Sequence, residues 1–268
     1  MKYVLIFMFT AFMNTVTLAN SEVFPVPENS VEAAFDGRNG TFVIIDCLSQ
    51  TVSTFHPELA AERLPPCSTF KIWNTLIGFE SGIISSPDEV FYKWSGKIYS
   101  RPEWNKDMTL KEAFRVSCVP AFQNLARKIG PEKMQLWLDK IKYGDCNTSS
   151  GIDVFWLPEK GRKPLLISPA GQAELICKLV NGKLPFSEKS RAALKEIMAV
   201  KMTANGAFYG KTGTGDDDSG KFNLGWFAGY VESNGKTYAF ACAIKGKGLM
   251  GMDARRIVET ILEKNGLL

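Results

Sequence analysis

Hydrophobic and polar residues alternate along stretches near both ends of the chain. Residues 40–47 (GTFVIIDC) and 51–55 read as two strands joined by a tight turn. Further strands are predicted over residues 207–211, 223–232 and 236–244. The strand pattern is therefore split between the beginning and the end of the chain.

The region between these strands has the spacing of amphipathic helices. One predicted helix covers residues 70–82 and ends at a glycine. The other expected helices lie, in chain order, at residues 30–35, 110–116, 121–129, 131–141, 169–181, 189–200 and 253–264. This order predicts an α/β protein of the α+β type, with a mostly antiparallel sheet and an inserted helical lobe. The sheet is expected from about residues 20–62 and 205–268, the lobe from about 63–204, and a ligand site in the crevice between them.

The first residues have the pattern of a secretory signal. Lys2 precedes an apolar stretch over residues 3–13, and the small residues of Thr17-Leu18-Ala19 match a signal-peptidase site. We expect a signal peptide over residues 1–19 and a mature domain over residues 20–268, periplasmic or secreted. The alternative is a membrane anchor, for which the apolar stretch is short. No stable anchor is expected elsewhere.

Charge and cysteine content narrow the function classes. The net charge is +4, and removal of Lys2 leaves 31 − 28 = +3 with no basic run, which argues against a nucleic-acid partner. The six cysteines lack the paired spacing of zinc sites, and His56 is the only histidine, so no metal is expected. Sequence alone does not choose a disulfide pattern among the cysteines.

Ser68-Thr69-Phe70-Lys71 is the most informative motif. A serine and a lysine three apart share one face of a helix, where the amine can take the hydroxyl proton. With His56 as the only histidine, lysine is the expected base. About one or two such matches arise by chance in a chain of this length. A second match, Ser233 to Lys236, lies on an Asn-Gly turn and is expected to be a solvated hairpin tip.

Three further motifs strengthen the first. They are Ser117-Cys118-Val119, Tyr143-Gly144-Asp145 with Trp156 beyond it, and Lys211-Thr212-Gly213 at the end of a predicted strand that leads into a loop over residues 214–220. If Ser68 and Ser117 converge on one site, a disulfide between the adjacent Cys67 and Cys118 becomes conceivable.

In order and spacing, these motifs resemble those of the class D (oxacillinase-type) serine β-lactamases over essentially the whole mature chain. The resemblance implies a β-lactamase/penicillin-binding transpeptidase-like fold and hydrolysis of a penicillin-type β-lactam amide through a Ser68 acyl-enzyme, which confers antibiotic resistance. It implies that Lys71 is N-carboxylated by carbon dioxide or bicarbonate, with no other cofactor, and acts as general base. Phe70, Val119 and Trp156 would form an apolar wall, and the Trp156 N–H would hold the carbamate.

The resemblance also implies the remaining roles. The backbone N–H groups of Ser68 and Thr214 would stabilise the oxyanion. Ser117 would relay a proton to the leaving nitrogen, although alone it would be interpreted as a helix N-cap. The carboxylate-binding residues would be Lys211, Thr212, Gly213 and either Arg255 or Arg256. Asp145 departs from the family, which usually has asparagine there, so the hydrogen bonding of that loop is open.

Two other functions remain as alternatives. One is a β-lactam-sensing domain that is acylated once without efficient turnover, and the other is a penicillin-binding peptidase or esterase. Tyr99, Trp104 and the acidic residues 216–218 are candidates for the border of the crevice. The sequence does not decide the β-lactam spectrum or whether the protein forms a homodimer.

Overall fold

The computed structural model describes residues 26–204, 206–216 and 221–268. Its main sheet has six strands, all pairs antiparallel, in the order β2-β1-β8-β7-β6-β5. The strands are β1 (Gly40–Asp46), β2 (Val52–Phe55), β5 (Ala199–Thr203), β6 (Gly206–Asp216), β7 (Phe222–Ser233) and β8 (Lys236–Lys245). The predicted antiparallel sheet from both ends of the chain is confirmed.

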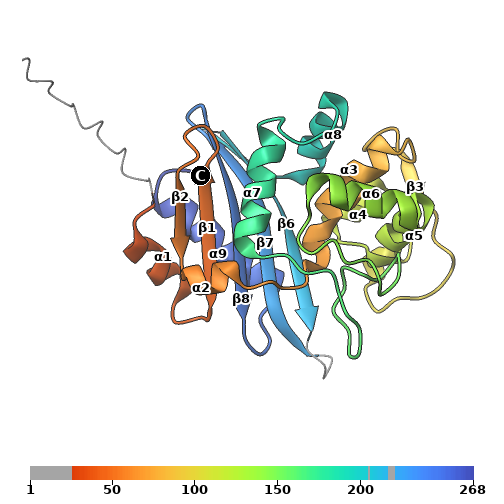
Figure 1. The fold of residues 1–268 in the computed structure, drawn as a ribbon, viewed down its shortest axis with the longest axis horizontal. Coiled ribbons are helices and arrows are strands. Elements are labelled where there is room, and N and C mark those ends of the chain that lie inside the picture. Colours follow the sequence, from red (N-terminus) through yellow and green to blue (C-terminus); the bar gives the residue numbers. More distant parts are fainter. Residues whose placement is uncertain (1–25, 205, 217–220) are drawn as a thin grey trace, which may run out of the picture.

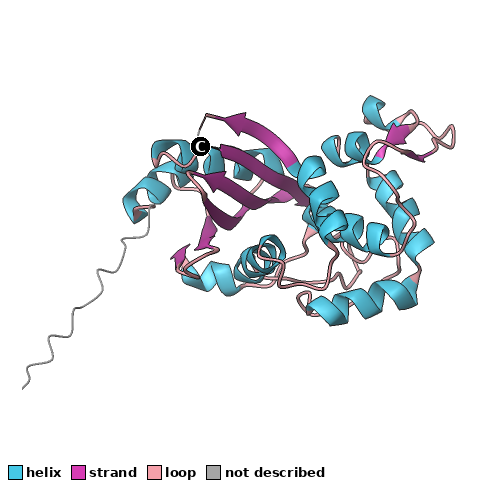
Figure 2. Cartoon of the chain, turned by 90° about the horizontal axis from the view of Figure 1, so that it is seen from above, coloured by secondary structure: helices cyan, strands magenta, loops and turns pink. Residues whose placement is uncertain are grey.

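Helices cover both faces of this sheet (Figures 1 and 2). On one face, α9 (Gly251–Lys264) packs on β7, and α1 (Glu28–Phe35) packs against α9. On the other face, α7 (Pro169–Val180) lies across β8 and β1, beside the short α2 (Pro57–Ala61). The predicted helix at residues 169–181 is therefore part of the layer that covers the sheet.

Side chains that alternate along the strands form two separate cores, one on each face of the sheet. On β8, the side chains of Phe240, Cys242 and Ile244 enter the core beneath α9. The intervening residues are small, and they face the core that includes α7: Ala239, Ala241 and Ala243. Because successive side chains in a strand point to opposite faces, both cores form from one alternating segment. The alanines leave room for α7 close to the sheet.

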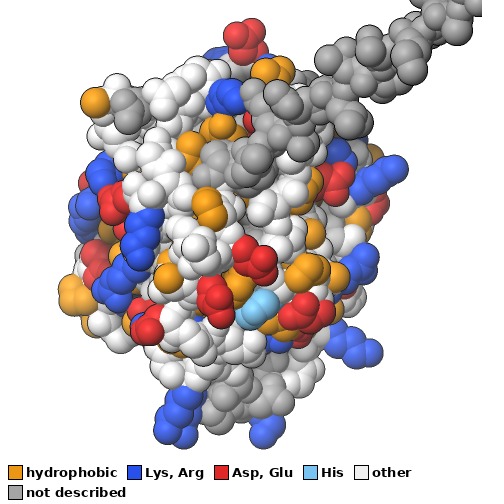
Figure 3. All heavy atoms as spheres, turned by 90° about the vertical axis from the view of Figure 1, so that its left-hand side faces the viewer, with side chains coloured by type: hydrophobic (Ala, Val, Ile, Leu, Met, Phe, Trp, Pro, Cys, Tyr) orange, Lys and Arg blue, Asp and Glu red, His pale blue; other side chains and the backbone are white. Residues whose placement is uncertain are grey.

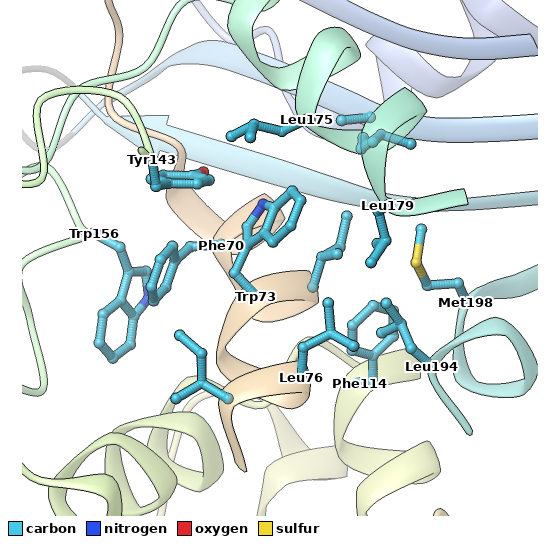
Figure 4. Packing of buried hydrophobic residues seen from close by; sticks show 14 of the residues in the cluster. Phe70, Trp73, Leu76, Phe114, Tyr143, Trp156, Leu175, Leu179, Leu194 and Met198 are labelled. Atoms are coloured by element: carbon cyan, nitrogen blue, oxygen red, sulfur yellow. The ribbon is translucent and has the colours of Figure 1, made fainter. Parts of the chain in front are cut away.

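The helical lobe surrounds one buried helix, α3 (Lys71–Glu80). Every residue of α3 from Lys71 to Gly78 is buried, as expected of a helix enclosed on all sides. Figure 4 shows its aromatic and aliphatic side chains packed in the centre of the lobe. Around it lie α4 (Leu110–Arg115), α5 (Val119–Ile129), α6 (Pro131–Ile141), α8 (Glu188–Met198), the 3-10 turns η1 (Cys67–Phe70) and η2 (Pro102–Trp104), and a hairpin of β3 (Val90–Tyr92) and β4 (Met108–Thr109).

The structure corrects several predicted details. β6 does not end at Lys211 but stays paired with β7 to Asp216, so the expected loop begins later. The segment around Ser68 is a 3-10 turn that leads into α3 rather than part of the helix itself. Ser233 and Lys236 do lie at a hairpin between β7 and β8, but Ser233 is buried rather than solvated. Strands β3, β4 and β5 were not predicted.

The predicted signal peptide, residues 1–19, lies outside the described residues. Within the described ranges, no helix combines the length and the apolar character that crossing a bilayer requires.

Candidate active site

Ser68 lies on η1, directly before the buried helix α3. The preceding Cys67 has a left-handed backbone (φ 51°), an uncommon conformation for a residue with a side chain. The Cys67 N–H donates to the carbonyl of Trp156 (3.1 Å), and the Thr69 hydroxyl donates to the carbonyl of Pro66 (2.6 Å). These bonds hold the turn, so that Ser68 stands partly exposed at the entrance to the lobe.

Lys71 is the neighbour of Ser68 on the first turn of α3. Its Nζ lies 2.8 Å from Ser68 Oγ, and its side chain is fully buried. Burial lowers the pKa of Lys71 from its usual 10.5 to about 7, because a charged amine loses its hydration there. A large fraction of the Lys71 amine is therefore uncharged near neutral pH, and such an amine can accept a proton.

An aromatic cluster accounts for this burial. Phe70 contacts the rings of Tyr143 (centroid distance 5.5 Å) and Trp156 (5.6 Å), as Figure 4 shows. On the other side, Lys71 Nζ lies 5.3 Å from the centre of the Phe122 ring. Phe122 is a site residue that sequence reasoning missed, although it lies one helical turn after Val119.

Trp156 carries a buried donor without a partner. Its side chain is fully buried, and Nε1 has no hydrogen-bond acceptor among the described residues. A buried unpaired N–H costs about 1–3 kcal/mol. The indole N–H is therefore suited to an acceptor that the protein chain itself does not supply.

Ser117 lies at the junction of α4 and α5, as the sequence predicts. Like Cys67, it is a left-handed non-glycine residue (φ 55°), and its N–H donates to the carbonyl of Phe114 (3.1 Å). The N-cap of α5 is Cys118 rather than Ser117. The Phe114 ring lies 5.6 Å from Lys211 Nζ, and Cys118 interacts with the charge of Lys71. Two neighbours of Ser117 in the chain, Phe114 and Cys118, therefore lie near Lys211 and Lys71 respectively.

β6 brings Lys211, Thr212 and Gly213 close to η1, the turn that carries Ser68. β5 pairs only with residues 206–209 of β6, so from Gly210 onward this side of β6 faces η1 instead of another described strand. A Cβ on Gly213 would lie 3.0 Å from Pro66 O and 3.2 Å from a Thr69 methyl. Glycine thus permits the close approach of the strand to the nucleophile segment.

Lys211 is the second buried lysine of the site. It is 4% exposed, and Nζ donates to Thr212 O (3.0 Å) and Thr212 Oγ1 (3.3 Å). Burial holds its pKa well below 10.5, and the charges of Lys71 and Arg101 lower it further. Two buried amines and the Arg101 guanidinium thus lie near one another, and whichever of them is protonated favours an anionic ligand.

The start of α9 closes the far side of β6. Thr214 Oγ1 accepts from the N–H of Gly251 (3.0 Å), which seats the helix on the strand. A cavity of about 710 Å³ has Lys211, Thr212 and Arg255 in its lining, but neither Ser68 nor Arg256. Both arginines pair with a carboxylate on α9, Arg255 with Glu259 (2.9 Å) and Arg256 with Asp253 (3.0 Å), but the Arg256 side chain is 70% exposed and that of Arg255 30%. Of the two candidate arginines, Arg255 is thus the one that shares a cavity with Lys211.

The structure shows the hydrogen bonding of Asp145, which the sequence leaves open. Its Oδ1 accepts from the N–H groups of Leu166 (3.0 Å) and Asn147 (3.2 Å). Both partners are donors, so a carboxylate serves this loop as well as an amide oxygen would. The preceding Gly144 is left-handed, and a Cβ there would overlap the carbonyl oxygen of Leu166.

Asp145→Asn should therefore leave the melting temperature within about 2 °C of the original. Asp145→Ala, the control, leaves two N–H groups without this acceptor and should lower it by about 2–6 °C, since each exposed hydrogen bond contributes about 1 kcal/mol or less. Differential scanning calorimetry measures both changes. A larger loss for Asp145→Asn than for Asp145→Ala would contradict this role of Oδ1.

The structure also shows the state of the cysteines and the position of the histidine. All six cysteines are free, so the conceivable Cys67–Cys118 disulfide is not formed. His56 is exposed, stacks on Phe55 (3.9 Å) and contacts Gly40 O (2.9 Å); Figure 3 shows the imidazole at the surface beside acidic side chains. In the described part of the chain, no group of three or more His, Cys, Asp and Glu residues could hold a metal ion.

The candidate border residues lie beside the Ser117 segment. Trp104 Nε1 donates to Val116 O (3.1 Å), and the Tyr99 ring packs edge-on against Trp104 (6.1 Å). Arg101 stacks over Trp104 (4.9 Å). Of the acidic loop, Asp216 ends β6, whereas Asp217 and Asp218 lie outside the described residues.

Comparison with known proteins agrees with this fold and this arrangement. Residues 31–263 match the penicillin binding protein transpeptidase domain. Beta-lactamase OXA-11 of Pseudomonas aeruginosa is 33% identical over the full chain and 99% of its own length. The structure of FUS-1 (OXA-85), a class D beta-lactamase from Fusobacterium nucleatum subsp. polymorphum, is 34% identical, with a TM-score of 0.83 over 90% of this chain and 98% of that one.

A receptor domain is also similar. The C-terminal domain of the Bacillus licheniformis BlaR penicillin-receptor is 30% identical, with a TM-score of 0.82 over 89% of this chain and 95% of the domain. The chain therefore belongs to the penicillin-binding protein transpeptidase family. Within that family, its full-length relatives and solved neighbours make it a class D β-lactamase.

Proposed function

We propose that the protein hydrolyses the β-lactam amide of penicillin-type antibiotics through an acyl-enzyme on Ser68, and so confers resistance. The observation that carries this proposal is the buried Lys71 amine, 2.8 Å from Ser68 Oγ and with a pKa near 7. A serine hydroxyl becomes a useful nucleophile only when a neighbouring base takes its proton. Membership of the class D β-lactamases supports this assignment.

The site also suits carbon dioxide bound to Lys71 as a carbamate. An uncharged amine is the form that combines with carbon dioxide, and the unpaired Trp156 N–H offers a donor to the added oxygens. When bound, this group supplies an anionic base next to Ser68. Phe122 and the stacked Phe70 and Trp156 rings contribute to the buried surroundings that favour the uncharged amine.

The remaining residues have roles that follow from their positions. The backbone N–H of Ser68, on the 3-10 turn before α3, and that of Thr214 on β6 would donate to the developing oxyanion. Lys211, Thr212 and Arg255 would bind the carboxylate that penicillins and cephalosporins carry. Ser117, whose neighbours Phe114 and Cys118 lie near Lys211 and Lys71, would pass a proton to the departing ring nitrogen.

Trp156→Phe should reduce turnover of a penicillin by about 10²-fold, the usual effect of removing one donor to a buried anion. Added bicarbonate should recover part of the loss. Trp73→Phe is a matched control, because Trp73 is also fully buried with an unpaired Nε1, but it packs against Tyr143 and Phe186. Equal losses in the two variants would show that the Trp156 N–H has no special role.

The similarity to the BlaR domain favours a second candidate function, a penicillin sensor that stays acylated. The regulatory protein BlaR1 of Bacillus licheniformis is 32% identical over 85% of this chain, whereas OXA-11 is 33% identical over all of it. We favour the hydrolase because the match to the β-lactamases covers more of the described fold, and we place its mature form, residues 20–268, in the periplasm or outside the cell.

Mass spectrometry of the mature protein mixed with a penicillin distinguishes the two functions. For a hydrolase, a peptide containing Ser68 gains the mass of the drug within milliseconds and loses it again while excess drug is consumed. A sensor would keep the added mass after the free drug is exhausted. Addition of the drug to a residue other than Ser68 would contradict both.

A further inference from the structure

Cys47 and Cys177 form a thiol pair away from the candidate active site. Cys47 follows the last residue of β1, and Cys177 lies on α7, the helix that covers this face of the sheet. Both are buried, at 3% and 2% exposure. The two thiols shift each other's pKa, and Gln50 and Asn181 each contact both residues, so the two side chains are neighbours across the junction of sheet and helix.

Two side-chain amides hold this pair together. Gln50 Nε2 donates to the carbonyl of Cys47 (2.8 Å) and to Cys177 Sγ (3.4 Å). Asn181 Nδ2 does the same from the end of α7, at 2.6 Å from the Cys47 carbonyl and 4.0 Å from Cys177 Sγ. Gln50 is left-handed (φ 63°) in the turn after β1, which aims its side chain back at the cysteines. The Cys177 sulfur is therefore held beside the backbone of Cys47, whose own sulfur contacts the carbonyl of Ile45 (3.8 Å).

The other four cysteines occupy different environments. Cys242 lies in the core on the opposite face of the sheet, beneath α9. Cys146 contacts the carbonyl of Leu138 (3.5 Å), and Cys67 contacts that of Pro65 (3.4 Å). Cys118 is buried at the start of α5.

We propose that Cys47 and Cys177 are a disulfide-forming site, which an exported protein disulfide or glutathione disulfide oxidises as α7 docks on the sheet. In the first step, the Cys177 thiolate attacks the S–S bond of the oxidant, forms a mixed disulfide and releases one thiol. In the second, the Cys47 thiolate attacks the Cys177 sulfur and releases the other thiol. Two electrons and two protons pass to the oxidant, and one intramolecular S–S bond forms.

The electrostatics agree with Cys177 as the attacking thiol. Interactions with Cys47 and Gln50 lower the pKa of Cys177. The pKa of Cys47 is raised instead, by its interaction with Cys177 and by its burial. The thiolate is the reactive form in disulfide exchange, so this asymmetry, as it develops while α7 approaches the sheet, favours Cys177 as the first to attack.

The bond would fasten α7 to the sheet. Its loop of about 130 residues contains both Ser68 and Ser117, and closing so long a loop limits the unfolded chain most strongly. α7 also carries Gln172, whose Nε2 donates to Thr69 Oγ1 (3.0 Å) beside the nucleophile. The cross-link would therefore fix α7, the helix that contacts η1 through Gln172.

The test refolds the mature protein in oxidised and in reduced glutathione, then maps disulfides by mass spectrometry and measures melting. We expect a Cys47–Cys177 peptide in the oxidised sample and a melting temperature about 5–15 °C higher than in the reduced one. Cys177→Ala should abolish this difference between samples, and Cys146→Ala, the control for loss of a thiol, should keep it.

Three results would overturn the proposal. They are a different dominant disulfide in the oxidised protein, the absence of any disulfide, and a redox-dependent melting difference that persists in Cys177→Ala. Each comparison is made within one variant, so a general loss of stability from the substitution does not obscure the outcome.

Discussion

Ser68→Ala should abolish measurable turnover of penicillins and cephalosporins, with a loss of about 10⁴-fold or more, as for other covalent nucleophiles. The reason is that the acyl-enzyme can form only on this hydroxyl, which has the Lys71 amine 2.8 Å away. Stopped-flow hydrolysis of a chromogenic cephalosporin measures the loss. The melting temperature should change little, because Ser68 is small and partly exposed.

The chain contains a matched control for this substitution. Ser233 begins the second Ser-x-x-Lys sequence, at the β7–β8 hairpin, and its Oγ accepts from Asn234 (3.5 Å). Ser233→Ala should keep full turnover. Residual activity in Ser68→Ala within tenfold of the original protein would contradict the assignment of the nucleophile.

The second large effect concerns the protonation of Lys71. Its folded pKa of about 7 lies below the usual 10.5, so the amine is mostly uncharged above pH 7 and gains a proton below it. The rate of acylation should therefore fall about tenfold for each pH unit below about 6, following the uncharged fraction. The pH dependence of kcat/KM measures this fall in rate, which is the acidic limb of the profile.

Protonation of Lys211 cannot produce this loss of kcat/KM at low pH. Its pKa is also lowered, but it acts through its charged form, and acidification increases that form and strengthens binding of a carboxylate. Lys71→Ala should lose about 10²–10⁴-fold in rate and should lack the acidic limb in its residual activity. A profile in Lys71→Ala that keeps the acidic limb would assign the titration to another group.

Periodicity predicts the parts of the fold with strong alternation. The strands β7 and β8 and the buried helix α3 were found because their apolar residues repeat over many positions. The two-residue β4 and the exposed β5 carry no such pattern and were missed. β6 continues past Lys211 because β7 pairs with it, which is a tertiary effect that local sequence does not show.

For the site, the sequence identifies the residue types, their order and, through the family resemblance, part of the apolar wall. The lowered pKa of Lys71 also depends on burial by residues that lie far away in sequence, among them Phe122, which only the structure reveals. The choice between Arg255 and Arg256 depends on which side of α9 faces β6. Asp145 departs from the family pattern yet keeps its acceptor role, which only the positions of its two donors reveal.

Sustained hydrolysis in the presence and absence of carbon dioxide tests the central claim most directly. The mature protein, in degassed buffer at pH 7.5 or above, is mixed with excess chromogenic cephalosporin, and bicarbonate is then added at constant pH. We predict slow turnover that rises severalfold with bicarbonate and is absent in Ser68→Ala. A single stoichiometric burst that bicarbonate does not extend would contradict the claim that Ser68 and Lys71 form a hydrolytic site.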